Sequence, residues 1–318
     1  MKLSIIIPLY NKEKEIKHTL DTLFNQSFSD FEVIIINDGS TDGSEEIIKR
    51  YDNKKIRLFN QENSGAAAAR NRGVKLAQNE WVAFLDADDE WKSNYLEKIV
   101  AAIKEYPQAI LIGTNYEILE NGESVVLDYP MVKKTTGIME NYFVSGREYT
   151  PLWTSAVVMK KDVFQELGGF PTECKTCEDV DLWCKVALRG QIIYINEPLA
   201  VYNRGNTSML SKSKDTTCYY PFLDEYGKYI KRRTDLLESV KDYVAYRQLV
   251  AVSFQLFNTG NKELAKTLLK KVKETRIYRK KYFFLKLMNY MPMCVIDLYT
   301  KYVTKMIHKR NVRNRDEI

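Results

Sequence analysis

The sequence predicts an α/β fold, in which helices flank a mostly parallel β-sheet and a helical extension follows at the C-terminus. In the first hundred or so residues, short runs of apolar and β-branched residues alternate with helical patterns. The strand runs are continuously apolar, which is typical of strands that are buried on both faces. From Tyr220 onward only helical patterns remain.

The order of the predicted elements divides the chain into two regions. Strand and helix pairs come first, with strands at residues 3–7, 31–36, 56–59 and 81–85 and helices at residues 12–25, 45–51, 66–77 and 94–104. Later elements are a hairpin (109–118 with 125–127), a loop-rich stretch to Thr150, a strand (156–159), a helix (161–166), a helix from Glu178 and a strand (192–195). We expect a first domain over residues 1–215 and a helical region over residues 216–318, with a break at Gly260-Asn261 between two of its helices.

The composition is that of a folded chain with an uneven charge. Hydrophobic residues make up 45% and charged residues 28% of the 318 residues, which is enough to bury a core. The net charge is +6, but residues 261–318 contain 16 Lys and Arg against 5 Asp and Glu, which leaves the preceding part slightly acidic. An anionic partner would therefore meet the C-terminal region. Nucleic acid is a poor candidate, because no recognised binding motif accompanies the charge.

The N-terminus and the cysteines indicate a cytoplasmic protein. The first apolar run ends at Pro8 and is too short for a signal peptide. No run of about eighteen uncharged apolar residues occurs. Five cysteines are an odd number, so reduced thiols are expected. Cys174 and Cys177 form a C-x-x-C pair, but a second pair is missing and both histidines are far away, so a structural zinc site is not expected.

An acidic run follows the strand at residues 81–85. Asp86, Asp88 and Asp89 place three carboxylates within four positions, and burying them is costly unless a cation compensates their charge. Because ligands bind at the carboxyl ends of strands in such sheets, this position favours a binding site. Hard oxygen ligands there suit Mg²⁺ or Mn²⁺ bridged to a substrate diphosphate. An acidic turn at a helix N-terminus is the alternative.

Two other strand ends should lie side by side and would suit a nucleotide base. Pro8 and Tyr10 end the first strand, and the Tyr10 ring would stack on a base. Asp38 ends the second strand, and its carboxylate would accept an N–H of the base. The same Asp, Ser and Gly residues are also ordinary formers of turns and helix N-caps, so a structural role for Asp38 stays open.

A third segment brings positive charge to the same edge of the sheet. Small residues at 66–69 let a helix approach the sheet closely, and Arg70 and Arg72 follow them. A guanidinium that faces the nucleotide would be useful there. For Arg72, we favour a solvated side chain on a packed helix.

A second acidic segment begins the helix at Glu178. Leu182, Val186 and their apolar neighbours follow Asp179 at helical spacing, so Asp179 should lie on the packed face. A carboxylate in that place is either a general base in a cleft, with Glu178 in support, or a cap favoured by the helix dipole. Asp181 is expected on a polar face.

Five segments taken together resemble the family 2 glycosyltransferases with the GT-A fold, a Rossmann-like sheet flanked by helices. They are SIIIPLYNKEKEI, VIIINDGSTDGS, NSGAAAARNRG, WVAFLDADD and CEDVDLWCKVALRG, in the family's order over roughly residues 1–210. The resemblance implies that Pro8, Tyr10 and Asp38 hold the nucleoside, and that Arg70 is the arginine of the Ala-Arg-Asn segment.

The same resemblance assigns the chemistry to four further residues. It implies that Asp86 contacts the ribose, that Asp88 coordinates the metal, and that Asp179 is the catalytic base beside Glu178. Arg204 matches the basic residue of a loop that folds over the diphosphate.

The implied activity is that of an inverting, metal-dependent glycosyltransferase of the hexosyl or N-acetylhexosaminyl type. The donor would be a nucleoside diphosphate sugar, UDP by resemblance, with Mn²⁺ or Mg²⁺ as cofactor. The acceptor would be a saccharide or lipid-linked hydroxyl in cell-surface polysaccharide or glycolipid synthesis. A catalytically idle protein of the same fold, which binds a nucleotide sugar or serves assembly, is the alternative.

The basic tail over residues 277–310 is rich in Tyr, Phe, Leu and Met, and Pro292 should split it in two. Such a segment would lie on an anionic membrane surface, which would place the protein at the inner face of the cell membrane. The alternative, equally supported by the sequence, is that its apolar stripe packs on the first domain or on a second subunit.

Overall fold

The computed structural model describes residues 1–51, 53–126, 132, 135–147, 150–174, 176–204, 218–272 and 277–303. The chain divides into two compact units, residues 1–211 with 220–236 and residues 212–219 with 237–318. The predicted boundary between residues 215 and 216 lies outside the described residues.

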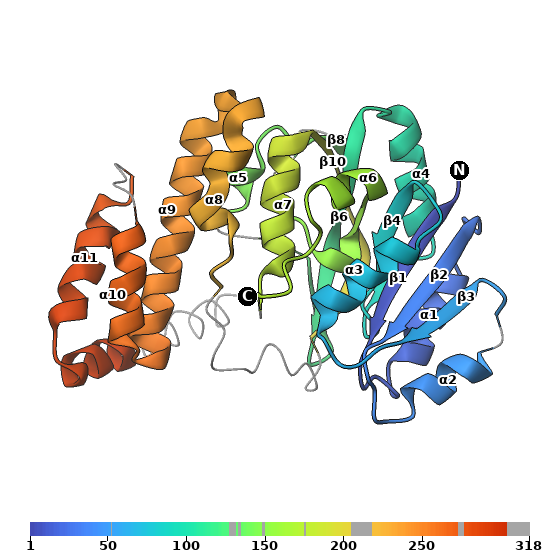
Figure 1. The fold of residues 1–318 in the computed structure, drawn as a ribbon, viewed down its shortest axis with the longest axis horizontal. Helices are drawn as coiled ribbons and strands as arrows, with labels where there is room; N and C mark the ends of the chain where they lie inside the picture. The colour runs from blue at the N-terminus through green and yellow to red at the C-terminus, as the bar shows by residue number, and fades with distance from the viewer. Residues whose placement is uncertain are drawn as a thin grey trace. The chain divides into compact units, whose positions relative to one another are not determined.

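The first unit is built on a mixed sheet whose ten strands lie within the described residues (Figure 1). In chain order they are β1 (Leu3–Leu9), β2 (Phe31–Asn37), β3 (Ile56–Asn60), β4 (Trp81–Phe84), β5 (Glu90–Trp91), β6 (Ala109–Glu120), β7 (Glu123–Val126), β8 (Thr136–Ile138), β9 (Val157–Lys160) and β10 (Gln191–Asn203). Its helices are α1 (Ile16–Phe24), α2 (Ser44–Arg50), α3 (Ala66–Leu76), α4 (Tyr95–Glu105), α5 (Tyr142–Ser145), α6 (Lys161–Glu166), α7 (Glu178–Arg189) and α8 (Phe222–Tyr229).

The strand order is β3-β2-β1-β4-β9-β6-β10-β5, with β7 beside β6 and β8 beside β10. β1 pairs in parallel with β2 and β4, and β2 pairs in parallel with β3. β9 lies antiparallel between β4 and β6, whereas β6 and β10 are parallel. The predicted α/β class is confirmed. The carboxyl ends of β1 to β4 meet at one edge of the sheet, and this edge carries the polar segments.

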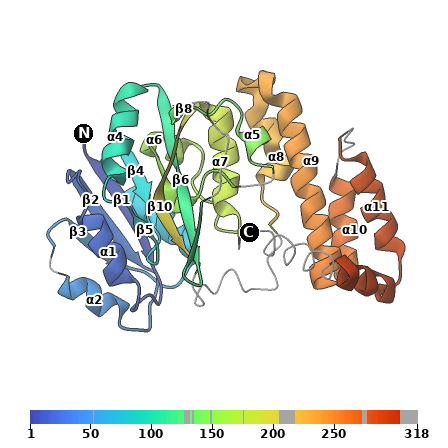
Figure 2. The ribbon, with the colours of Figure 1, turned by 180° about the vertical axis from the view of Figure 1, so that it is seen from behind.

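Helices cover both faces of the sheet. Side chains of β1 point alternately to the two faces and so contact helices on each side. Ile5 and Ile7 lie in a buried cluster with residues of α1 and α4. Ile6 faces α3 instead, where a Cβ at Gly73 would lie 2.3 Å from its Cγ2, so only glycine allows this approach. Figures 1 and 2 show the same division, with α3, α6 and α7 on one face and α1 and α4 on the other.

The second unit is helical, as predicted. It contains α9 (Leu237–Phe254), a π-helical turn (Gln255–Thr259), α10 (Lys262–Lys271), α11 (Arg279–Tyr290) and helical residues 293–303. The predicted break is confirmed: Gly260 ends one helix with φ +70°, and the Asn261 side chain caps the next. Pro292 splits the tail as expected. None of the helices described is both long enough and apolar enough to cross a bilayer.

Strand β10 differs from its prediction, which stopped at residue 195. The strand continues through Pro198 to Asn203 and pairs with β6, with register shifts on either side of the proline. The polar and proline residues at 196–198 hide this continuation in the sequence. β5, β8 and α5 were not predicted; they are two, three and four residues long.

Two expectations about single residues are wrong. Asp181 is fully buried rather than on a polar face, because the Phe222 N–H donates to it at 2.7 Å and the Lys185 ammonium lies 2.6 Å away. The five cysteines are not all reduced: Cys177 and Cys218 are disulfide-bonded, whereas Cys174, Cys184 and Cys294 are outside any disulfide. Spacing along the chain does not show which thiols meet in space.

Candidate active site

The loops that follow β1 and β2 are fastened to each other at the sheet edge. The Asp38 N–H donates to the Leu9 carbonyl at 2.8 Å, and the Asn11 N–H donates to Ser40 Oγ at 3.1 Å. Asn11 has a left-handed backbone, φ +50°, and its side chain accepts from the Thr41 N–H. The two strand ends therefore lie side by side, as predicted from the order of the strands.

Tyr10 and Asp38 differ in what they offer to a ligand. The Tyr10 ring is 40% exposed, directly after β1 and two residues beyond Pro8, and is free to stack on a planar group. Asp38 is buried, and it accepts hydrogen bonds from the Gln61 side chain at 2.7 Å and from the Ser64 and Gly65 N–H groups. Because Gly65 begins α3, Asp38 also organises that helix end. A carboxylate has about four acceptor positions, and three of those of Asp38 are taken within the protein.

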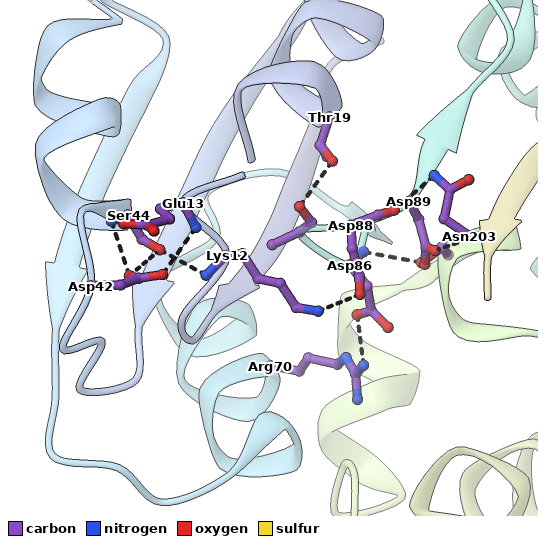
Figure 3. A network of polar contacts seen from close by, with 12 residues as sticks. Lys12, Glu13, Thr19, Asp42, Ser44, Arg70, Asp86, Asp88, Asp89 and Asn203 are labelled. Atoms are coloured by element: carbon purple, nitrogen blue, oxygen red, sulfur yellow. Dashed lines mark hydrogen bonds and ion pairs between the residues drawn. The ribbon is translucent and has the colours of Figure 1, made fainter. Parts of the chain in front are cut away.

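Each carboxylate of the acidic run has a different partner (Figure 3). Asp86 Oδ1 lies 2.6 Å from Arg70 Nη2, and Asp88 Oδ2 lies 2.5 Å from Lys12 Nζ. Asp89 is buried and accepts from Ser155 Oγ at 2.7 Å. Burial, reinforced by the charges of Asp86 and Asp88, raises the pKa of Asp89 well above its ordinary value. Asp86 and Asp88 thus face cations, while Asp89 serves the structure.

Lys12 is a site residue that the sequence analysis missed. It follows β1 within the segment PLYNKEKE, and its side chain reaches across to Asp88 (Figure 3). Although burial acts to lower the pKa of Lys12, the hydrogen bond and the charge of Asp88 outweigh it and raise that pKa. The signal was present in the order of the strands, because β1 and β4 are neighbours and end at the same edge.

Arg70 joins the two acidic segments. Its guanidinium is buried, and Nη1 lies 3.1 Å from Glu178 Oε1 while Nη2 contacts Asp86. It also lies over the Phe170 ring at 5.6 Å. Burial acts to lower the pKa of Arg70, but the Asp86 and Glu178 carboxylates outweigh it, so the group is a permanent cation. Arg72 donates instead to the Asn60 carbonyl and to the Gln61 side chain.

Asp179 lies in the first turn of α7, next to Glu178. Its Oδ1 accepts from the Val180 N–H at 2.7 Å, and its Oδ2 accepts from Thr154 Oγ1 at 3.3 Å. Burial of the carboxyl, reinforced by the Glu178 charge, raises the pKa of Asp179 to about 7. Some of the side chain remains accessible to solvent. A carboxyl with this pKa can take up and release a proton near neutral pH.

In the part of the chain described, Arg204 forms no ion pair with Asp86, Asp88, Glu178 or Asp179. Its Nη1 lies 3.9 Å from Glu120 Oε2, and its guanidinium lies 5.9 Å from the centre of the Tyr202 ring. The side chain is half exposed, and the residues that follow it lie outside the described ranges. Its role over a diphosphate stays a prediction.

The residues present fit a divalent cation at Asp88. The Lys12 ammonium shows that positive charge is already stabilised there. Mg²⁺ commonly takes one or two protein carboxylates and completes its shell with water and substrate phosphate. Among the described residues no group of three or more His, Cys, Asp and Glu could hold a metal alone. Asp88, with Asp86, would therefore hold the ion together with a phosphorylated ligand.

A parallel half-sheet with these groups at its carboxyl edge, and an antiparallel strand beside it, is the arrangement that the resemblance to GT-A glycosyltransferases predicted. Known families agree with this class. The model of glycosyl transferase family 2 matches residues 4–168, and the chain belongs to that family. The family resemblance drawn from the five sequence segments is thereby confirmed.

Similar proteins extend this picture. The chain is 29% identical over 267 residues to the glycosyltransferase GlyA of Streptococcus pneumoniae, covering 79% of this chain but only 38% of GlyA. It is 32% identical over 257 residues to the amylovoran biosynthesis glycosyltransferase AmsB of Erwinia amylovora, covering 77% of this chain and 82% of AmsB. The crystal structure of S. aureus TarS 1–349 in complex with UDP-GlcNAc has the same fold, with a TM-score of 0.66, 20% identity, and coverage of 94% of this chain and 90% of that chain.

Proposed function

We propose that this glycosyltransferase moves a hexosyl or N-acetylhexosaminyl group from UDP to an acceptor hydroxyl, with inversion at the anomeric carbon. The observation that carries the proposal is the Arg70 guanidinium, which contacts Asp86 of one acidic segment and Glu178 of the other. Asp86 and Glu178, about ninety residues apart in the sequence, thus contact the same guanidinium. Donor-binding groups and a base would then lie around one reacting sugar.

The donor would lie along the carboxyl edge of the sheet. The exposed Tyr10 ring would stack on the base, with Pro8 and Asp38 shaping the pocket around it. Asp86 would contact the ribose, and Arg204 would approach the diphosphate. The TarS structure, which contains UDP-GlcNAc, supports a uridine donor.

The reaction would be a single displacement. The acceptor oxygen would form a bond to the anomeric carbon as the bond from that carbon to the diphosphate oxygen breaks. Asp179 would accept the acceptor's proton, and Glu178 would remain paired with Arg70. A Mn²⁺ or Mg²⁺ ion at Asp88, when bound, supplies Lewis-acid stabilisation of the departing diphosphate.

The acceptor would be a saccharide or lipid-linked hydroxyl in the synthesis of a surface polysaccharide or glycolipid, at the inner face of the cell membrane. AmsB, a protein of amylovoran biosynthesis, supports a polysaccharide product. The catalytic domain would be residues 1–215. These assignments concern the described chain, which spans little more than a third of GlyA.

The test is sugar release or transfer from a panel of nucleotide sugars with Mn²⁺, comparing the native chain with Asp179→Asn. We expect one donor to be consumed, and the substitution to lower kcat about 10²–10⁴-fold without weakening donor binding in calorimetry. Glu173→Gln, at an exposed acidic residue of the preceding loop, should leave the rate unchanged. An unchanged rate in Asp179→Asn contradicts the base. A native chain that binds a donor but never consumes one supports the binding-only alternative.

A further inference from the structure

Helix α11 presents apolar side chains on two opposite faces. Leu285 and Met288 are buried in the core of the second unit, together with residues of α9 and α10. Phe283, Leu287 and Tyr290 follow one another at spacings of four and three, so they share the opposite face. These three side chains are 51%, 55% and 71% exposed. The packing of the helix on its own unit therefore explains only one of its faces.

Exposed apolar residues are concentrated in this part of the chain. Of the seventeen large hydrophobic side chains exposed among the described residues, ten lie between Ile277 and Tyr302. In the helical residues 293–303, Leu298 and Tyr302 are exposed at a spacing of one turn. Exposed apolar side chains that are concentrated in one segment suggest a contact with a partner or a membrane.

Positive charge frames the outer face of α11. Lys280 and Lys286 lie three residues before and three residues after Phe283, and both are exposed. Arg279 lies over the Phe283 ring at 5.7 Å. Within residues 277–303 there are five Lys and Arg and one acidic residue, Asp297. Long basic side chains beside an apolar face can extend toward charged headgroups while their stems cover apolar surface.

The charges decide between two occupants of this face. In a symmetric pair of copies each surface meets itself, so the same lysines and arginine would be brought near one another. An anionic bilayer instead offers opposite charge at its surface and an apolar layer just beneath it. At 1.5 Å per residue, the twelve residues of α11 span about 18 Å, less than the roughly 30 Å of a hydrocarbon core. The helix therefore suits a position in the plane of the interface.

We infer that the face formed by Phe283, Leu287 and Tyr290 binds the surface of an anionic phospholipid bilayer, with Lys280 and Lys286 at the headgroups. This deepens the membrane contact of the proposed function, and it rests on that function only for the location of the acceptor. The inner face of α11 packs on α9 and α10 of its own unit, a partner that neither alternative from the sequence named, and the outer face is the one that we assign to lipid.

The test is sedimentation of the full chain with vesicles, without nucleotide, metal or acceptor. We expect binding to vesicles of equal phosphatidylglycerol and phosphatidylcholine, and at least tenfold weaker binding to pure phosphatidylcholine. Serine at Phe283, Leu287 and Tyr290 together should lower the affinity for the mixed vesicles by about a hundredfold or more. Serine at Val125 and Val126 of β7, which are similarly exposed, is the matched control and should have no effect.

A second variant keeps the test decisive if the triple substitution disturbs folding. Lys280→Gln with Lys286→Gln changes no packed side chain and should weaken binding to the mixed vesicles about tenfold, with less effect at high salt. Native chain that stays in solution with both vesicles overturns the inference. The inference is also overturned if the native chain does not bind vesicles but forms a dimer, and the triple substitution converts that dimer to a monomer. Because no donor is present, neither result bears on sugar transfer.

Discussion

The two acidic segments of the site differ in how their charge is compensated. In the run after β4, Asp86 and Asp88 each contact a cation, Arg70 or Lys12. At the start of α7, Glu178 contacts Arg70, but within the described residues Asp179 has no ion pair and accepts only hydrogen bonds from Thr154 and Val180. The carboxylates that face cations suit the binding of a metal ion, which can in turn bind a phosphate. The unpaired one, with its raised pKa, suits proton transfer.

The largest effect on this arrangement should come from Arg70→Met. The substitution leaves Asp86 and Glu178 without their shared cation, so we expect transfer to fall at least about a hundredfold and the free energy of unfolding to drop by about 3 kcal/mol. Arg70→Lys should recover only part of both, because an ammonium lacks the planar fork that contacts two carboxylates. Steady-state kinetics and urea unfolding measure these losses. Arg72→Met is the control, and equal losses in the two variants would contradict the role of Arg70.

A smaller effect is expected from Lys12→Met. Lys12 and a divalent cation compete for Asp88, so removing the ammonium should tighten Mn²⁺ binding about fivefold in the presence of UDP, as expected for an ion pair worth about 1 kcal/mol. The free Mn²⁺ signal in electron paramagnetic resonance reports this without any turnover. Lys14→Met, at an exposed lysine two residues away, should behave as the native chain. Equal Mn²⁺ affinity in Lys12→Met would remove Lys12 from the site.

The smallest effect should follow Thr154→Val. The Thr154 hydroxyl donates to Asp179 Oδ2 and so favours the ionised carboxylate. Without it, the pKa of Asp179 should rise by about half a unit, because a hydrogen bond of this kind contributes about 1 kcal/mol or less. The acidic limb of the kcat/KM profile would then move to higher pH, with the plateau rate kept. A shift to lower pH would contradict the contact.

Features that depend on residues near one another in the sequence could be predicted from it, whereas contacts between distant residues could not. The strands β1 to β4 and the polar segments after them were predicted, because apolar runs and strand-end residues are local signals. The contacts of Asp86 and Glu178 with Arg70 were not predicted, since they join three distant parts of the chain and the resemblance gave each residue only its own role. Lys12 was missed because its partner is seventy-six residues away.

The burial of a side chain could not be predicted from the sequence where residues of other elements determine it. The helical spacing placed Asp179 on the packed face and Asp181 on a polar face, whereas Asp179 is only partly buried and Asp181 is fully buried. Asp181 is buried because Lys185 lies one turn away and the Phe222 N–H arrives from α8. A pattern of apolar residues does not show such compensation. The outer face of α11 was likewise hidden, since its apolar residues cannot be assigned to a packed or an exposed side without the neighbouring helices.

The most direct test of the difference between the two acidic segments is the titration of Asp179 itself. Carbon-detected NMR of the carboxyl groups, with the signal assigned from Asp179→Asn, would follow its protonation in the chain without ligand. We expect an apparent pKa of about 7, so that the carboxyl is largely protonated at pH 6 and ionised at pH 8. A pKa near 4 would show that Asp179 is compensated like its acidic neighbours, and the division into binding carboxylates and a poised base would be wrong.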